Sequence, residues 1–182
     1  PISGTEYMTH NNLRGSVCTA LFRKEILHDL RFPKGILHED EEFTPQLMLR
    51  AENLYFTNNK AYYYRKREGS IMHKRDKRWH IRRLADAEQV LYRLKERVDY
   101  LPVKERIAME RRIAQLTMDH IYNVITMTHD ETHLNHVLQR LSRHGLFPLP
   151  DKDYTSKYKW FRRMTNSSFG RKTLIMLLRA KG

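Results

Sequence analysis

The spacing of apolar residues divides the chain into a mixed first part and a helical second part. After about residue 74, apolar residues recur every three or four positions, which is the period of one face of a helix. The stripes comprise Leu84, Ala87, Leu91, Leu94 and Val98; then Ile113, Leu116, His120 or Ile121, and Val124; and then Leu134, Val137 or Leu138, and Leu141. Pro102 separates the first two stripes, Gly145 is expected to cap the third helix, and a short helix is predicted over residues 170–180.

The first part alternates short apolar runs with turn residues. Residues 16–22 are apolar and partly β-branched, which predicts a buried strand, and residues 23–30 predict a short helix. Residues 53–58 and 60–67 predict two short strands around an asparagine-rich turn. We therefore expect the α+β class, mostly α, with a small sheet near the N-terminus and only helices after it.

Four consecutive carboxylates, Glu39 to Glu42, lie just before a further predicted helix that runs to about Ala51. Proline is tolerated in the first turn of a helix and costs about 3 kcal/mol in its interior. Thr44 is therefore expected to be the N-cap and Pro45 the first helical residue, which places the carboxylates in a loop. The alternative is that these acids decorate a helix N-terminus, where the helix dipole favours them.

Composition narrows the class of protein. The 182 residues carry a formal net charge of +13, with 40% hydrophobic residues, which fits one globular domain or one core with an appended subdomain. No run approaches 18 apolar residues, and no signal segment opens the chain. The sole cysteine, Cys18, excludes an internal disulfide framework and suits a reducing compartment. The opening at Pro1 suggests a piece of a longer protein.

Three stretches in the first part carry a resemblance to a known family. They read VCTALFRKEIL, LRFPKGILHEDEEF and AYYYRKREGSI, in that order. Together they resemble the C-terminal half of the catalytic domain of family 2 glycosyltransferases, the bacterial polysaccharide type with a GT-A fold. The resemblance covers roughly residues 1–75. It implies that residues 1–73 are the acceptor-side part of that domain, with a sheet remnant of the GT-A α/β fold. Residues 74–182 would then be a helical C-terminal extension.

The resemblance also implies roles for individual residues. Asp40 matches the general base that removes the proton of an acceptor hydroxyl while a nucleotide sugar is displaced with inversion. Crowding by like charges raises a carboxylate's pKa, which suits this task. Glu39 would be a structural or acceptor-positioning partner. The residues matching the loop that closes over the diphosphate are Arg65, Arg67 and Ser70, and His73 stands where relatives place a metal or diphosphate ligand.

One element of the family pattern is missing from the sequence. Relatives hold Mn²⁺ or Mg²⁺ with an Asp-x-Asp motif in an N-terminal nucleotide-binding half, where the ion acts on the leaving group. The nearest form here is Asp151–Lys152–Asp153, which is late in the chain and flanked by proline. The metal is therefore expected in the full-length enzyme and not in these residues, and the fragment alone is expected to be inactive.

The other candidate features concern binding. His129, His133 and His136 would share one helix face, which suits either zinc or a solvated surface. Residues 157–182 interleave basic and aromatic residues without an acid, which fits either a packed terminal helix with a solvated cationic rim or contact with an anionic membrane surface, and favours the membrane over nucleic acid. The expected location is the cytoplasm, at the inner face of the membrane where that contact forms. The alternative to an enzyme is a basic helical module for nucleic-acid binding or oligomerisation.

Overall fold

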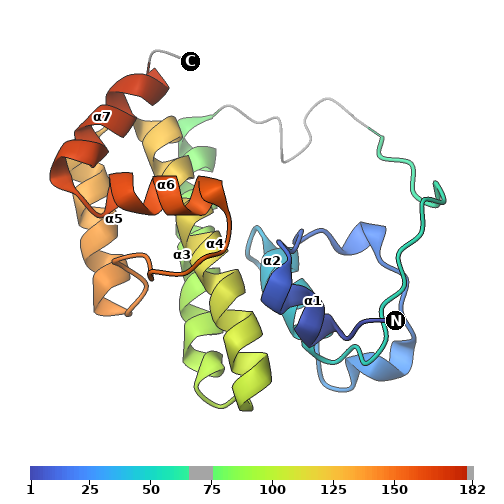
Figure 1. Cartoon of the computed structure of the whole chain (residues 1–182). Coiled ribbons are helices and arrows are strands. Elements are labelled where there is room, and N and C mark those ends of the chain that lie inside the picture. Colours follow the sequence, from blue (N-terminus) through green and yellow to red (C-terminus); the bar gives the residue numbers. More distant parts are fainter. Residues whose placement is uncertain (66–75, 180–182) are drawn as a thin grey trace.

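The computed structural model describes residues 1–65 and 76–179, with the side chain of Lys77 excepted, and within these ranges the chain is helical (Figure 1). The α-helices are α1 (Gly4–His10), α2 (Glu39–Leu49), α3 (Lys77–Val98), α4 (Val103–Thr128), α5 (Glu131–Arg143), α6 (Ser156–Thr165) and α7 (Ser168–Arg179). Two 3₁₀ helices, η1 (Val17–Thr19) and η2 (Lys24–Leu27), lie between α1 and α2. None of the described helices is both long and apolar enough to cross a bilayer.

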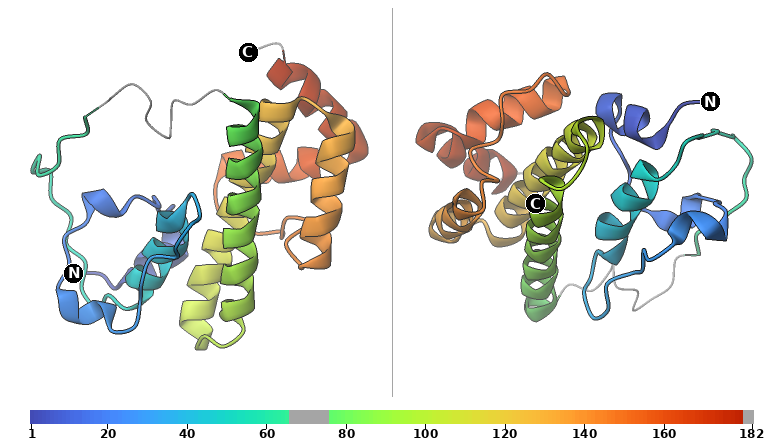
Figure 2. Two further views of the ribbon diagram at one scale, coloured as in Figure 1. Left: turned by 180° about the vertical axis from the view of Figure 1, so that it is seen from behind. Right: turned by 90° about the horizontal axis from the view of Figure 1, so that it is seen from below.

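The predicted apolar stripes form the centre of the molecule. Helices α3 and α4 lie side by side, and α5 packs against α4 (Figures 1 and 2). The stripe residues Leu91, Leu94 and Val98 of α3 are buried in the same apolar cluster as Ile121 and Val124 of α4. Periodicity thus predicted these helices correctly, because each is long enough for the stripe to repeat several times.

Helix α5 ends one residue earlier than predicted, so that Gly145 follows the cap residue instead of being it. His144 is the last half-helical residue, and Gly145 follows it with a φ of 66°. The amide of Leu146 donates to the carbonyl of Leu141 at 2.9 Å, and the amide of Gly145 donates to that of Ser142 at 3.0 Å. A left-handed glycine closing the last turn in this way is a common helix stop.

The C-terminal region contains one helix more than the stripes predict. Helix α7 corresponds to the predicted helix over residues 170–180, whereas α6 was missed. The hydroxyl of Thr155 caps α6 by accepting from the amide of Tyr158 at 3.1 Å, and Tyr158 and Phe161 are buried. A capping threonine followed by apolar residues three positions apart was the available signal.

The predicted α+β class is wrong, because the described residues contain no sheet. Residues 16–22 contain η1 and an irregular segment instead of a strand, and the only pairing found among the described residues is an isolated bridge between Ile2 and Leu54. Residues 61–65 are exposed and irregular. A strand needs a neighbour to satisfy its backbone hydrogen bonds, and no other described segment is placed to pair with these runs.

The first part shares a core with the helices after it. Helix α1 packs on α4 and helix α2 packs on α3 (Figure 2). Met8 of α1 is buried in the same apolar cluster as the residues of α3, α4 and α5. The predicted boundary between residues 73 and 74 lies outside the described residues.

Helix α2 begins earlier than predicted. Its N-cap is His38, with a φ of 65°, so the predicted loop before Thr44 is wrong. The hydroxyl of Thr44 instead donates to the carbonyl of Gly15 at 2.8 Å, and Pro45 lies inside the helix. The interior proline is offset by burial of Phe43 and Leu47 in a small second core.

Candidate functional site

The acidic cluster, Glu39 to Glu42, occupies the first turn of α2. This is the alternative position that the sequence left open, in which the helix dipole favours the negative charges. The four side chains point in different directions around the turn, so each meets a different environment. Their partners separate the structural carboxylates from the candidate catalytic one.

Glu41 ties α2 to α4. Its carboxylate accepts a hydrogen bond from Arg112, whose side chain is only 5% exposed and which also donates to the carbonyl of Leu13 at 2.6 Å. Burial raises the pKa of Glu41, while the charge of Arg112 opposes that rise. Glu41 and Arg112 therefore form a buried joint between the two parts of the chain.

Glu42 ties α2 to α3. Its side chain is 4% exposed and lies 3.4 Å from Arg93 and 3.4 Å from Arg97. A carboxylate so deeply buried needs compensating charge, and these two arginines supply it. Glu42 is thus a structural residue.

Asp40 differs from both neighbours. It is half-buried, and no salt bridge to it occurs within residues 1–65 and 76–179. Burial, and then the adjacent Glu39, raise the pKa of its carboxyl, while the backbone amides of the first helical turn lower it. Glu39 itself is exposed. The pKa values of Asp40 and Glu41 are both raised, but Glu41 is engaged by Arg112, so Asp40 is the one of the two whose carboxylate is free to accept a proton from a ligand.

The predicted diphosphate-binding residues are only partly placed. Arg65 is exposed in an irregular segment, and no hydrogen bond or ion pair joins it to the acidic cluster in the described part of the chain. Arg67, Ser70 and His73 lie outside the described residues. The structure therefore brings Asp40 and Glu39 together and leaves their proposed cationic partners untested.

The remaining metal candidates are not assembled into a site. His129 is the left-handed residue after α4, so the prediction that it shares one helix face with His133 and His136 is wrong. Asp151 lies 3.2 Å from Arg162, and Asp153 pairs with Lys159. No group of three or more His, Cys, Asp or Glu side chains that could hold a metal occurs among the residues that the structure describes.

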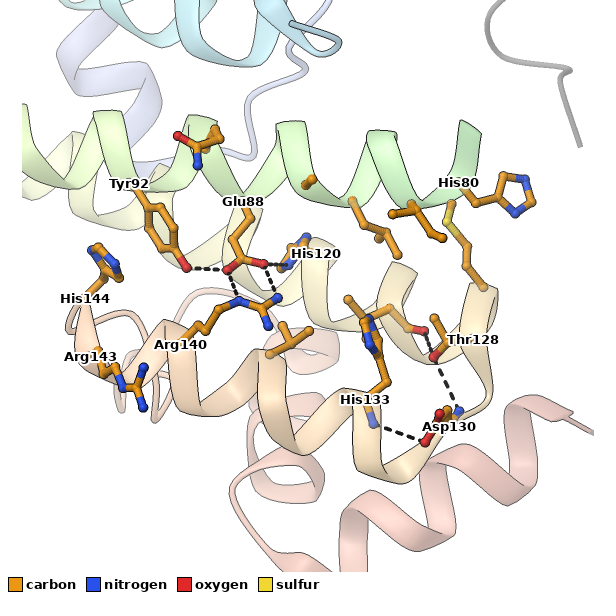
Figure 3. A pocket seen from close by; sticks show the side chains of 17 residues that line it. His80, Glu88, Tyr92, His120, Thr128, Asp130, His133, Arg140, Arg143 and His144 are labelled. Carbon is orange, nitrogen blue, oxygen red and sulfur yellow. Dashed lines mark hydrogen bonds and ion pairs between the residues drawn. The ribbon is translucent and has the colours of Figure 1, made fainter. Parts of the chain in front are cut away.

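Sequence reasoning missed a cavity of about 810 Å³ among α3, α4 and α5 (Figure 3). Glu88 lies at its centre, accepting from Tyr92 and from two nitrogens of Arg140, at 2.7 and 2.8 Å. The signal was present, because Glu88 is four residues after Leu84, on the apolar face of α3. A charged residue at a core position usually marks a paired or functional group.

Comparison of the chain with protein-family models, with curated proteins and with solved structures found no match. The functional proposal therefore rests on the geometry of the acidic cluster and on the three sequence stretches that carry the resemblance.

Proposed function

We propose that this chain is the acceptor-side portion of an inverting glycosyltransferase that acts on a nucleotide sugar in polysaccharide synthesis. The observation that carries the proposal is the environment of Asp40. Its carboxyl is half-buried beside Glu39, which raises its pKa towards the range where a general base works best. In the proposed reaction, Asp40 accepts the proton of the acceptor hydroxyl while that oxygen bonds to the anomeric carbon and the nucleoside diphosphate departs.

The partners of the neighbouring carboxylates support assigning the base to Asp40. Glu41 is held by Arg112, and Glu42 by Arg93 and Arg97, so both carboxylates are occupied by arginines and are not free to meet an acceptor hydroxyl. These ion pairs also fix the first turn of α2 against α3 and α4. Asp40 is thereby positioned on a rigid turn, which a general base requires.

None of the contacts described above binds the nucleotide-sugar donor of the proposed reaction. Asp151 and Asp153 do not fit the divalent ion of the family, because each is already paired with a cation. We propose that Mn²⁺ or Mg²⁺ and the nucleotide are bound by other parts of the full-length enzyme. The present residues supply acceptor binding and proton removal.

The experiment that tests this function is a transfer assay with the full-length gene product. Nucleoside diphosphate release is measured from a panel of nucleotide sugars with and without saccharide acceptors. Acceptor-dependent release giving a product with inverted anomeric configuration is the expected result. Retention of configuration, or absence of release across the panel combined with tight DNA binding at about 150 mM salt, would overturn the proposal.

We also propose that α6 and α7 contact an anionic membrane surface on the cytoplasmic side. Large apolar side chains are exposed on these helices, with Trp160 at 51% and Phe169 at 81%, among exposed residues such as Arg163 and Lys172. Aromatic residues among cations suit insertion at the headgroups of anionic lipids.

Vesicle sedimentation tests this contact. Replacing Trp160 and Phe169 together with serine is expected to weaken binding to phosphatidylserine vesicles about tenfold, which corresponds to about 1.4 kcal/mol. Tyr100→Ser, at another exposed aromatic residue, is the matched control and should bind as the unaltered chain does. Equal binding by all three proteins, or equal binding to neutral phosphatidylcholine vesicles, would contradict the proposal.

A further inference from the structure

The cavity among α3, α4 and α5 has the size and walls of a small-molecule site. Its volume, about 810 Å³, lies within the usual range of ligand pockets, about 300–1,000 Å³. Among its apolar lining residues, Ile81 of α3 and Met127 of α4 are accessible, and Leu84, Val124 and Val137 are buried behind them. The walls belong to the rigid core, so the cavity is formed without a ligand.

The two acidic groups in the cavity each accept hydrogen bonds from within the chain. The carboxylate of Glu88 is held by Arg140 and Tyr92, and Asp130 accepts from the amides of Thr132 and His133 to cap α5. The charge of Glu88 is therefore already met by Arg140, whereas Asp130 is exposed and keeps its charge. Asp130 lies away from Arg143 in the cavity, so an anionic group beside Arg143 does not meet it (Figure 3).

The groups that remain are cationic or donate hydrogen bonds. His120 is 3% exposed, and neither of its ring nitrogens has a hydrogen-bond partner among the described residues, since Nε2 lies 3.6 Å from Glu88. Both nitrogens are buried behind the cavity wall, so His120 does not meet a ligand directly. Arg143 lines the same cavity and forms no ion pair among the described residues. Arg143 and His144 lie at one end, and His80 lies at the other (Figure 3).

We propose that this cavity binds an amphipathic anion, an alkyl or aryl carboxylate or phosphate. Its apolar body lies along the accessible side chains of Ile81, Tyr92 and Met127, and its anionic group meets Arg143. The cavity residues do not include the acidic cluster of α2, so this site does not depend on the proposed transferase activity.

Fluorescence titration with anilinonaphthalene sulfonate, which joins aromatic rings to an anionic group, tests the proposal on the 182-residue chain. Dodecanoate and dodecyl phosphate are expected to displace the probe, and comparison of the two distinguishes a carboxylate site from a phosphate site. Dodecyltrimethylammonium, which is cationic, and dodecyl maltoside, which is neutral, should displace it only weakly. Equal displacement by all four compounds would overturn the anionic class.

Two variants locate the probe. Ala85→Trp places a large ring in the cavity from an exposed position, and Arg143→Glu reverses the free charge. Each is expected to raise the dissociation constant of the probe about tenfold or more. The matched controls are Gln139→Trp and Arg14→Glu, at exposed positions outside the cavity, which should bind as the unaltered chain does.

Probe binding by these variants can also disprove the proposal. Unchanged probe binding by folded Ala85→Trp, checked by circular dichroism, would place the probe elsewhere. If that variant does not fold, unchanged binding by Arg143→Glu overturns the site by itself, because Arg143 is exposed and forms no hydrogen bond or ion pair among the described residues.

Discussion

Asp40→Asn is expected to slow sugar transfer by the full-length polypeptide by about 10²- to 10⁴-fold, the usual contribution of a general base. Asparagine keeps the size and hydrogen-bonding shape of the side chain but cannot accept the acceptor's proton. Nucleotide-sugar binding should change little, because the proposed role of Asp40 concerns the acceptor hydroxyl. Steady-state rates of nucleoside diphosphate release measure the first effect, and calorimetric titration of donor measures the second.

Two further variants serve as comparisons for the effect of Asp40→Asn on transfer. Asp99→Asn makes the same chemical change at the exposed end of α3 and should leave transfer unchanged. Glu39→Gln removes the neighbouring charge and should slow transfer less than Asp40→Asn does, since Glu39 acts on the base and not on the proton. Transfer by Asp40→Asn at the rate of the unaltered enzyme would remove Asp40 from the mechanism.

Glu88→Ala is expected to lower the free energy of unfolding by about 3 kcal/mol, near the lower end for breaking a buried charge pair. Truncation of Glu88 leaves both Arg140 and Tyr92 without their hydrogen-bond acceptor, and it leaves His120 beside a larger void. The side chain of Arg140 is 45% exposed, so water replaces part of the lost interaction. Urea denaturation monitored by circular dichroism measures the change.

The behaviour of Glu88 in acid adds a second readout. Burial raises the pKa of Glu88, but the hydrogen bonds from Arg140 and Tyr92, with His120 close by at 3.6 Å, outweigh burial and lower that pKa overall. Because the folded pKa is depressed, the stabilisation is present above the unfolded value, about 4.3, and is lost as pH falls. The difference between the unaltered chain and Glu88→Ala should therefore shrink in acid.

A matched truncation on the same helix provides the control. Glu96→Ala removes an exposed carboxylate of α3 and should change the free energy of unfolding by less than about 0.5 kcal/mol. A Glu88→Ala effect as small as that of Glu96→Ala would show that the network contributes little to the fold.

The helices after residue 76 could be predicted because their information is local. A stripe such as Leu84, Leu91 and Leu94 repeats over several turns, and packing against a neighbour preserves its period. The first part lacked such a long pattern. Apolar runs of strand length, such as residues 16–22, form strands only beside a partner, and the described residues offer none.

Local sequence patterns were also insufficient to predict the structure of the acidic cluster. Proline chemistry predicted a helix start at Thr44, but packing of Phe43 and Leu47 outweighed the interior Pro45. The arginines that neutralise Glu41 and Glu42 lie 71 and 51 residues further along the chain, so no local pattern links them. The sequence showed where the carboxylates lie along the chain, but only the fold distinguished Asp40 from its structural neighbours.

The pH dependence of kcat/KM for the acceptor tests the role of Asp40 most directly. A base must be ionised to act, and burial beside Glu39 raises the pKa of the Asp40 carboxyl. The rate constant should therefore rise with pH through an apparent pKa above about 3.9, the usual value for aspartate. The residual activity of Asp40→Asn should lack that rise. An identical pH profile in the two proteins would contradict Asp40 as the base.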